Sequence, residues 1–314
     1  MTYTILATAR SFARENPQPL RLLEAAGCAV IRPRDEDEWR ALLPRADGII
    51  AGLETYNAET LAICGRLKVI SRYGVGYDAI DLNAARKKGI SVAYTPGANS
   101  DSVADLAAGL MIAAARHVPF MDAAIRHRAS ERPPGLEIWR KTLGVLGTGR
   151  IGKGVMKRMS GFEMRMLCHD ICRDETAVSS LGGSYTDLDT LLTQSDFITI
   201  HLPLTGKTRG MIGETAFRKM KSTAVLVNTA RGGIVDEHAL YEALKNGRLF
   251  AAALDTMIDE PPYNSPLAAL PNCILTPHAG AATIEAAHNM GMMAAQNLLA
   301  LLATTCRGGV TGAA

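Results

Sequence analysis

The chain has 314 residues, of which 47% are hydrophobic and 21% charged, a composition typical of a globular protein long enough to divide into two domains. Its formal net charge of +3 is small and its basic residues are scattered, which argues against nucleic-acid binding. No apolar run approaches the roughly 18 residues of a membrane span, and the N-terminus lacks the features of a secretory signal, so we expect a cytoplasmic protein with no membrane partner.

The first 95 residues alternate short apolar runs with helical patterns. The apolar runs predict strands at 3–7, 28–31, 48–51, 68–72 and 90–94. The intervening patterns predict helices at 11–26, 39–43, 58–64 and 82–88. Strands that alternate with helices favour a parallel α/β sheet, so this part of the chain could form a domain by itself.

A Thr-Pro-Gly sequence at 95–97 interrupts that alternation. The pattern after it predicts one long helix from 100 to about 129, which Pro119 could kink. Small side chains crowd the first half of this helix and would let another helix approach closely, from the same chain or from a partner subunit. Residues 130–139 are expected to form a loop.

The second half of the chain returns to the α/β alternation. Strands are predicted at 143–146, 164–168, 196–201, 224–228, 249–254 and 273–276. Helices are predicted at 151–159, 188–193, 214–220, 236–245 and 283 to about 303. Asp236 and Thr283 have the side chains of N-caps, and the tail from Cys306 is expected to fray.

The central strand of this half runs into a glycine turn and then a helix, the order that a dinucleotide pyrophosphate needs. Gly147 would allow a tight turn, Gly149 would let the backbone approach the pyrophosphate, and Gly152 would let the helix pack closely on the strand. The helix N-terminus adds unpaired N–H groups and a positive dipole end. The motif alone would also suit a glycine-rich turn in any α/β protein.

An acidic residue follows at the expected distance. Asp170 comes after the next apolar strand, about 20 residues past the glycines, where it can accept both ribose hydroxyls of NAD and repel the 2′-phosphate of NADP. We therefore favour NAD as the cofactor. Arg173 lies close enough to keep NADP as an alternative.

Polar residues at the ends of the predicted strands form the candidate site, because ligands of open parallel sheets bind beyond these ends. These residues are Tyr73, Asp170, His201, Arg231, Asp255, Glu260 and His278. Arg231 could bind a carboxylate and the adjacent carbonyl, His278 could exchange a proton with the carbonyl oxygen, and Glu260 could orient the imidazole. Singly, each of them could equally be a capping, loop or structural residue.

The cysteines do not suggest a disulfide framework or a metal site. They lie far apart and mostly within apolar runs, as expected of reduced, buried thiols. Their positions are Cys28, Cys64, Cys168, Cys172, Cys273 and Cys306. Although Cys168 and Cys172 could be called a pair, no matching Cys or His pair follows at metal-ligand spacing, so no metal is expected.

Taken together, these motifs resemble the NAD-dependent D-2-hydroxyacid dehydrogenase family, and within it the short phosphoglycerate dehydrogenase-like branch without a regulatory domain. The resemblance covers nearly the whole chain. It rests on the glycine motif with Asp170, Asp255 followed by Glu260, and the segments 72–78 (RYGVGYD), 95–99 (TPGAN), 201–205 (HLPLT), 228–236 (NTARGGIVD) and 276–280 (TPHAG).

The resemblance implies a Rossmann dinucleotide-binding domain, 97–283, inserted into a flavodoxin-like substrate domain formed by 1–96 and 284–314. It implies Arg231, Glu260 and His278 as the catalytic set, with Arg72, Val75, Gly76 and Asn99 at the substrate. It places at NAD the residues Gly147, Gly149, Arg150, Ile151, Gly152, Asp170, His201, Pro203, Thr208, Thr229, Ala230, Asp255 and Gly280. It also implies a homodimer formed through the 100–129 helix.

The implied activity is hydride transfer between NAD(H) and a small 2-hydroxy or 2-oxo acid, with D-3-phosphoglycerate first and glyoxylate or hydroxypyruvate as the alternative. The chain departs from the family in two places, of which the first concerns the phosphate. The loop 51–57 has no basic residue where phosphoglycerate-using relatives often place an Arg, which leaves Arg72, or Arg126 or Arg128 of a second subunit, as phosphate partners. Asp105 stands where the family commonly has Glu.

Two other functions remain open. The family includes non-enzymatic NAD-sensing corepressors, which keep the fold and even the catalytic residues and often carry disordered extensions. The same glycine turn also occurs in proteins that bind adenine nucleotides or methyl donors, although that function leaves Arg231, Glu260 and His278 without a role.

Overall fold

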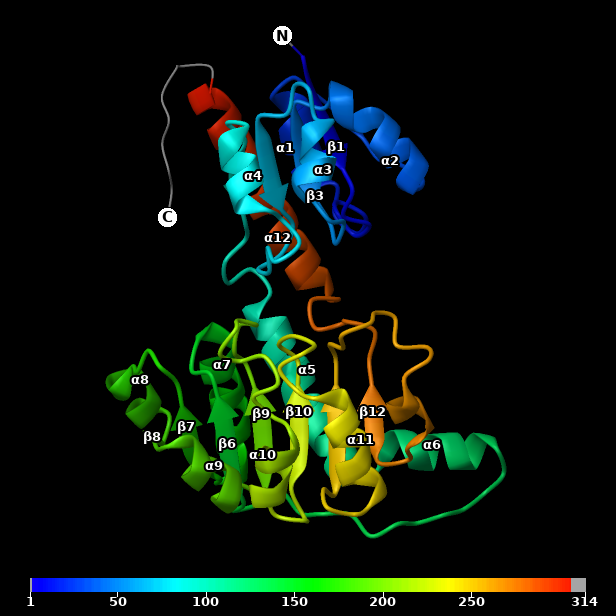
Figure 1. The fold of residues 1–314 in the computed structure, drawn as a ribbon, viewed down its shortest axis with the longest axis vertical. Coiled ribbons are helices and arrows are strands. Elements are labelled where there is room, and N and C mark those ends of the chain that lie inside the picture. Colours follow the sequence, from blue (N-terminus) through cyan, green and yellow to red (C-terminus); the bar gives the residue numbers. More distant parts are fainter. Residues whose placement is uncertain (1, 306–314) are drawn as a thin grey trace. The chain divides into compact units, whose positions relative to one another are not determined.

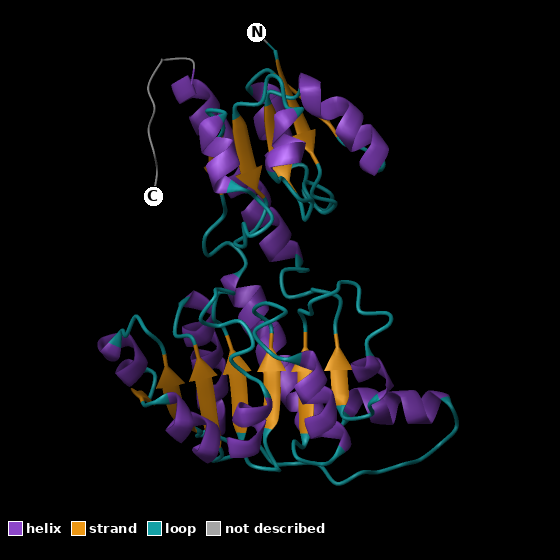
Figure 2. Ribbon diagram, viewed as in Figure 1, coloured by secondary structure: helices purple, strands orange, loops and turns teal. Residues whose placement is uncertain are grey.

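The computed structural model describes residues 2–305, which form two compact α/β units. One unit holds the chain up to Asn99 and again from Ala282 onward, and the other holds Ser100–Ala281. The second unit is therefore inserted into the first, and each unit is built around its own parallel sheet (Figures 1 and 2).

The first unit has a five-stranded parallel sheet in the order β2-β1-β3-β4-β5, the flavodoxin-like order. Its strands are β1 (Tyr3–Ala7), β2 (Cys28–Ile31), β3 (Gly48–Ala51), β4 (Val69–Arg72) and β5 (Ser91–Ala93). Its helices are α1 (Gln18–Ala25), α2 (Glu36–Leu42), α3 (Ala58–Ala62), α4 (Leu82–Lys87) and α12 (Ile284–Thr305), and a 3₁₀ turn spans Leu43–Arg45.

The last helix, α12, completes this unit by packing on β3, β4 and β5 and against α1. The buried hydroxyl of Ser71 in β4 donates a hydrogen bond of 2.8 Å to the carbonyl of Ala294. Thr283 Oγ1 accepts from the backbone N–H of Ala286 at 3.0 Å, which confirms the expected N-cap.

The second unit has a seven-stranded parallel sheet in the order β12-β11-β10-β9-β6-β7-β8. Its strands are β6 (Thr142–Leu146), β7 (Arg165–His169), β8 (Gly183–Tyr185), β9 (Phe197–Ile200), β10 (Val225–Asn228), β11 (Ala251–Leu254) and β12 (Cys273–Leu275). Its helices are α5 (Ser100–Ala115), α6 (Val118–Arg126), α7 (Arg150–Met159), α8 (Glu175–Ser180), α9 (Leu188–Gln194), α10 (Glu214–Lys219) and α11 (Glu237–Lys245). Two 3₁₀ turns span Ser160–Phe162 and Pro266–Ala269.

This strand order is that of the Rossmann fold, and it confirms the predicted fold class. Helices cover both faces of the sheet, so the inner strands β9, β10 and β11 are buried along their whole length. In β10, Leu226 packs into one hydrophobic cluster, whereas Val225 and Val227 pack into the cluster on the other face, with α5 and α7. Asp236 caps α11 by accepting from Ala239 N at 3.0 Å, as expected.

The single long helix predicted over 100–129 is wrong. The structure has two helices, α5 and α6, with a bend of 65° between them. His117 adopts a left-handed conformation (φ 52°) and ends the helical path, and Pro119 lies in the first turn of α6, where its missing N–H costs nothing.

The helix predicted over 11–26 is also too long. In the structure α1 begins only at Gln18, with Pro17 as its N-cap residue. Ala13 adopts a left-handed conformation (φ 51°), and a proline disfavours helical backbone in the residue before it, here Asn16, so the helix does not extend back to residue 11. The pair α8 and β8, an outer strand with its helix, was not predicted, because β8 has only three residues.

No single helix among residues 2–305 has the length and apolar character to cross a membrane, and only the bent pair α5 and α6 meets that test, by length and composition alone. Cys28, Cys64, Cys168, Cys172 and Cys273 are free thiols, and Cys306, like the tail expected to fray, lies outside the described residues. Cys172 is exposed rather than buried.

Candidate active site

The carboxyl ends of the second unit's strands all meet at one edge of the sheet. The chain leaves β6 first toward β7 and β8 and later returns beside β6 as β9, so the topological switch point lies between β6 and β9. Ligands of open α/β sheets bind at such a point. The glycine turn follows β6, Asp170 follows β7 and His201 follows β9.

The glycine turn after β6 has the geometry that its sequence predicts. Gly147 has a φ of +96°, and a Cβ there would lie 2.6 Å from the carbonyl oxygen of His201. A Cβ on Gly152 would overlap the carbonyl oxygen of Gly147, so only glycine lets α7 start this close to β6. Gly149 has nothing within 4 Å of its Cβ position, which leaves its backbone open to a ligand. Arg150 and Ile151 form the first turn of α7.

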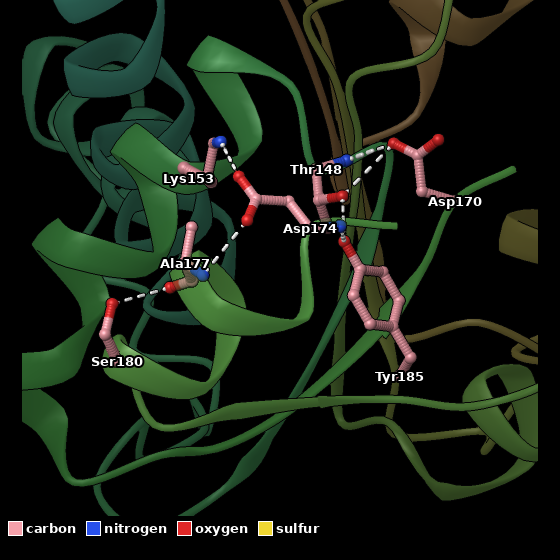
Figure 3. A network of polar contacts seen from close by, with 7 residues as sticks. All are labelled: Thr148, Lys153, Asp170, Asp174, Ala177, Ser180 and Tyr185. Atoms are coloured by element: carbon pink, nitrogen blue, oxygen red, sulfur yellow. Dashed lines mark hydrogen bonds and ion pairs between the residues drawn. The ribbon is translucent and has the colours of Figure 1, made fainter. Parts of the chain in front are cut away.

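The carboxylate of Asp170 faces this turn (Figure 3). Its Oδ2 accepts hydrogen bonds from the backbone N–H of Thr148 at 2.7 Å and from Thr148 Oγ1 at 3.2 Å. Its Oδ1 accepts from the backbone N–H of Cys172 at 2.9 Å. Thr148, which the sequence analysis did not single out, therefore connects the glycine turn to the acidic residue.

Three buried polar atoms beyond β9, β10 and β11 have no hydrogen-bond partner within the described chain: His201 Nδ1, Thr229 Oγ1 and Thr256 Oγ1. Leaving such an atom unpaired costs about 1–3 kcal/mol, so a ligand that formed hydrogen bonds with these three atoms would recover that cost. A nicotinamide carboxamide offers both donors and an acceptor. These atoms, the glycine turn and Asp170 together fit a nicotinamide dinucleotide at this edge.

The imidazole of His201 is neutral. Burial lowers the pKa of His201 to about 3, and its Nε2 shares a hydrogen bond of 2.8 Å with Thr199 Oγ1. An uncharged imidazole is suited to hydrogen bonding with a cofactor and not to proton transfer near neutral pH.

Asp255, after β11, holds the turn that carries His278. Its side chain is buried, and Oδ1 accepts from Thr276 Oγ1 at 2.6 Å and from Ala279 N at 2.7 Å. Oδ2 accepts from Gly280 N at 2.8 Å. His278, inside this turn, has a left-handed backbone conformation (φ 54°). The Asp255 carboxylate thus holds this turn through hydrogen-bond donors that come before and after His278 in the chain.

His278 and Glu260 form a hydrogen-bonded pair. Nδ1 of His278 lies 2.8 Å from Oε2 of Glu260, and Oε1 accepts from Met257 N at 3.1 Å. Burial by itself would raise the pKa of Glu260, but the hydrogen bond and charge of His278, the Met257 N–H and the charge of Arg231 lower the pKa below its ordinary value. No residue of the described chain bonds Nε2 of His278, whose side chain is 35% exposed.

Arg231 lies in the turn after β10. Asn228 holds this turn, because its Nδ2 donates to the carbonyl of Arg231 at 2.9 Å and its Oδ1 accepts from Ala230 N at 3.0 Å. A Cβ on Gly232 would overlap the backbone of Met257, so this glycine lets the Arg231 turn pack against the segment that leads to Glu260. Asn228 and Gly232 occur in the quoted motif, but the sequence did not reveal their positioning roles.

Other predicted cofactor residues have local partners. Thr208 Oγ1 donates to the carbonyl of Pro203 at 2.6 Å and accepts from Thr205 N at 2.8 Å, so it shapes the loop after β9. Among residues 2–305, no group of three or more His, Cys, Asp and Glu side chains is placed to hold a metal ion.

The predicted substrate residues lie in the first unit. Nε of Arg72 donates to the carbonyl of Gly76 at 2.9 Å, and Nη1 donates to the carbonyls of Ala51, at 3.3 Å, and Tyr73. Its guanidinium therefore shapes the 73–76 turn, which includes Val75. The buried Oδ1 of Asn99 has no partner within residues 2–305.

The first unit also contains a cavity of about 640 Å³ beyond the ends of β1, β2 and β3. Its lining includes Arg10, Arg34 and Arg40 as well as Asp35, Glu36 and Glu54. The carboxylate of Glu54 accepts a hydrogen bond of 2.6 Å from Thr8 Oγ1. Equal numbers of these basic and acidic side chains leave the lining without a net positive charge.

Comparisons with known proteins show which family the chain resembles. Residues 108–280 match the family model described as D-isomer specific 2-hydroxyacid dehydrogenase, NAD binding domain. The chain is 44% identical over 261 residues to a D-3-phosphoglycerate dehydrogenase of Archaeoglobus fulgidus (82% of this chain, 50% of that protein). It is 45% identical over 279 residues to a glyoxylate reductase of Thermofilum pendens (86% of this chain, 79% of that protein).

A solved structure is similar over the whole chain. The D-lactate dehydrogenase of Aquifex aeolicus, complexed with NAD and lactic acid, has a TM-score of 0.84 at 27% identity and covers 99% of this chain and 100% of that chain. By contrast, the chain spans about half the length of the D-3-phosphoglycerate dehydrogenases that it matches.

Replacing Gly152 by Ala should weaken NADH binding and destabilise the second unit by about 1–3 kcal/mol, because the added Cβ would force α7 away from β6. Fluorescence titration with NADH and urea denaturation measure the two effects. Gly161→Ala is the matched control, since a Cβ there has nothing within 4 Å. Wild-type affinity and stability in Gly152→Ala would contradict this account of the turn.

The lowered pKa of Glu260 predicts a pH-dependent contribution to stability. The ionised carboxylate stabilises the folded state fully above its ordinary pKa of 4.5, and this contribution is lost as the pH falls through the lower folded-state pKa. The difference in melting temperature between wild type and Glu260→Gln should therefore be largest above pH 4.5 and shrink below it. A difference that stays constant into this acid range would refute the prediction; Glu214→Gln, in an exposed ion pair, is the control.

Proposed function

The chain belongs to the D-isomer specific 2-hydroxyacid dehydrogenase family, and from this premise we propose that it transfers a hydride between NAD(H) and a small 2-hydroxy or 2-oxo acid. The observation that carries the proposal is the His278–Glu260 pair of 2.8 Å, held at the cofactor edge of a Rossmann sheet. A protein that only binds adenine nucleotides or methyl donors would leave this pair without a role.

His278 is the proposed acid and base. Glu260 accepts a hydrogen bond from Nδ1, which fixes the ring so that Nε2 can give a proton to the carbonyl oxygen of a 2-oxo acid. In the oxidative direction Nε2 would take that proton back. Asp255 fixes the turn on either side of the imidazole and so keeps the ring in place.

Arg231 is the proposed anchor for the substrate. A guanidinium offers donors in a planar fork that matches a carboxylate and the adjacent carbonyl oxygen. Its positive charge would also polarise the carbonyl as negative charge develops on the oxygen. Asn228 and Gly232 position the turn that carries Arg231.

NAD is the proposed cofactor, and when bound its nicotinamide supplies or accepts the hydride. The glycine turn would hold the pyrophosphate, and Asp170 the adenosine ribose. His201, Thr229 and Thr256 would give their unpaired buried atoms to the nicotinamide end. The first three residues of α7, from Arg150, offer backbone N–H groups to phosphate.

Within this class we propose an unphosphorylated 2-oxo acid, such as glyoxylate or hydroxypyruvate, ahead of the phosphorylated acid favoured by the sequence. Arg72 is occupied with backbone carbonyls, and Leu53 and Glu54 stand in the loop where phosphoglycerate-using relatives often place an Arg. A carboxylate at this position would repel a phosphate. D-3-phosphoglycerate remains the second candidate, since it is the substrate named for the Archaeoglobus relative.

We also propose a cytoplasmic homodimer formed through α5 and α6. Ile112, Val118 and Ile125 are large apolar side chains with 37%, 48% and 67% of their surface exposed, and a partner subunit would bury them. The bend between α5 and α6 means that this interface would use two helices instead of the one that the sequence predicted.

The proposed function can be tested by NADH oxidation with glyoxylate, hydroxypyruvate, phosphohydroxypyruvate and pyruvate, using NADPH as the control cofactor. We expect the highest kcat/KM with an unphosphorylated acid and with NADH. The highest value with phosphohydroxypyruvate would instead support the second candidate. Tight NADH binding without turnover of any 2-oxo acid would favour a non-enzymatic NAD sensor.

Replacing His278 by Ala should lower kcat by roughly 10²–10⁴-fold, because the carbonyl oxygen loses its proton donor. The dissociation constant of NADH should stay near the wild-type value. Steady-state kinetics and fluorescence titration separate the two effects, and His238→Ala, at an exposed position on α11, is the matched control. Normal turnover with weakened NADH binding would show that His278 serves the cofactor instead.

A further inference from the structure

We propose that Tyr185 is a positioning residue for Asp170 and sets the preference for NAD over NADP. The inference rests on the proposed function, because it concerns how the same cofactor edge distinguishes two dinucleotides. Tyr185 ends the outer strand β8 and is not part of the glycine motif. Figure 3 shows its hydroxyl close to both the Thr148 side chain and the backbone nitrogen of Asp174, away from the Asp170 carboxylate.

Two hydrogen bonds connect Tyr185 to the Asp170 carboxylate through Thr148, and a third joins its hydroxyl to the backbone of Asp174. The hydroxyl of Tyr185 lies 3.0 Å from the backbone nitrogen of Asp174 and 2.6 Å from Thr148 Oγ1. Thr148 Oγ1 in turn lies 3.2 Å from Asp170 Oδ2. The connection therefore runs from the loop after β7, through β8, to the glycine turn after β6.

The chemistry of these groups gives the connection one direction. The N–H of Asp174 can only donate, so the Tyr185 oxygen accepts from it. The ionised Asp170 carboxylate can only accept, so the Thr148 hydroxyl donates to it. The remaining hydrogen, on Tyr185, then points to Thr148 Oγ1. Every hydrogen has one acceptor, and such chains strengthen their members cooperatively.

This arrangement confines both Thr148 donors to one oxygen of Asp170. Oδ2 accepts the Thr148 N–H and hydroxyl, while Oδ1 has only the Cys172 N–H. A carboxylate has about four lone-pair positions, so Oδ1 keeps capacity for a ribose hydroxyl. The same anion, held in place, repels the second phosphate that distinguishes NADP.

The ring of Tyr185 has a second effect. The guanidinium of Arg173 lies over this ring, 5.3 Å from its centroid, and Nη1 is 3.9 Å from the Glu175 carboxylate. Arg173 follows Asp170 by three residues and is the cation that made NADP an alternative from the sequence. Both the Tyr185 ring and the Glu175 carboxylate attract the Arg173 guanidinium, so Arg173 is less available to a 2′-phosphate.

The Asp174 carboxylate anchors the far end of the connection. Its Oδ2 accepts from Lys153 of α7 at 2.8 Å and its Oδ1 caps α8 by accepting from Ala177 N at 3.1 Å (Figure 3). The backbone N–H that reaches Tyr185 is therefore on a residue whose side chain is already fixed. Losing the Tyr185 hydroxyl should therefore change the contact with Thr148 and leave Asp174 in place.

The test compares Tyr185→Phe with wild type by fluorescence titration of NADH and NADPH in the absence of substrate. The variant keeps the ring and loses the hydroxyl. We expect its NADH dissociation constant to rise about 3–10-fold, in line with one or two hydrogen bonds, with little change for NADPH. Tyr185→Ala also removes the ring and should in addition tighten NADPH binding. Tyr241→Phe is the control, since its hydroxyl bonds no residue in 2–305.

Steady-state kinetics give a second measurement. Tyr185→Phe should raise the KM for NADH and leave kcat and the KM for the 2-oxo acid near wild type. An unchanged ratio of NADPH to NADH affinity, or equal weakening of both with a lower melting temperature, would overturn the inference and leave Tyr185 a structural residue. Wild-type protein that bound neither dinucleotide would overturn the proposed function, and this inference with it.

Discussion

Because all seven strands of the second sheet run in one direction, each delivers its C-terminal turn to the same edge. The candidate site depends on this constraint. Residues that are more than a hundred positions apart in the chain, such as Gly147 and His278, reach one edge only because β6, β9, β10, β11 and β12 lie side by side. Gly147 and Gly152 allow α7 to start close against β6 at the switch point.

The acidic residues at this edge have different roles, which depend on the hydrogen bonds that each carboxylate already accepts. Asp255 is buried and uses both oxygens to hold the turn around His278, so its role is to position His278. Glu260 is half-buried and divides its oxygens between Met257 and His278. Asp170 keeps capacity on Oδ1. The unpaired buried atoms of His201, Thr229 and Thr256 are the complementary case, polar groups that a ligand would satisfy.

Most strands could be predicted from the sequence to within one or two residues, because a strand buried on both faces is a short apolar run bounded by polar turns. The glycine spacing and Asp170 could be recognised for a similar reason, since they are local features. The predictions failed where the sequence pattern gave no clear sign of the structure. A left-handed His117 divides the predicted 100–129 helix, and β8 is too short to stand out by composition.

By itself the sequence determined the fold class, the family resemblance and the residue types from which a site could be built, since these follow from periodicity and from short motifs. Only the tertiary structure decided which side chains meet: the pairing of His278 with Glu260, the hold of Asp255 on the 276–280 turn, and the hydrogen bonds from Tyr185 through Thr148 to Asp170. These contacts join turns from different strands. Their geometry depends on the register of the sheet, which brings distant segments within hydrogen-bond range and which no single segment encodes.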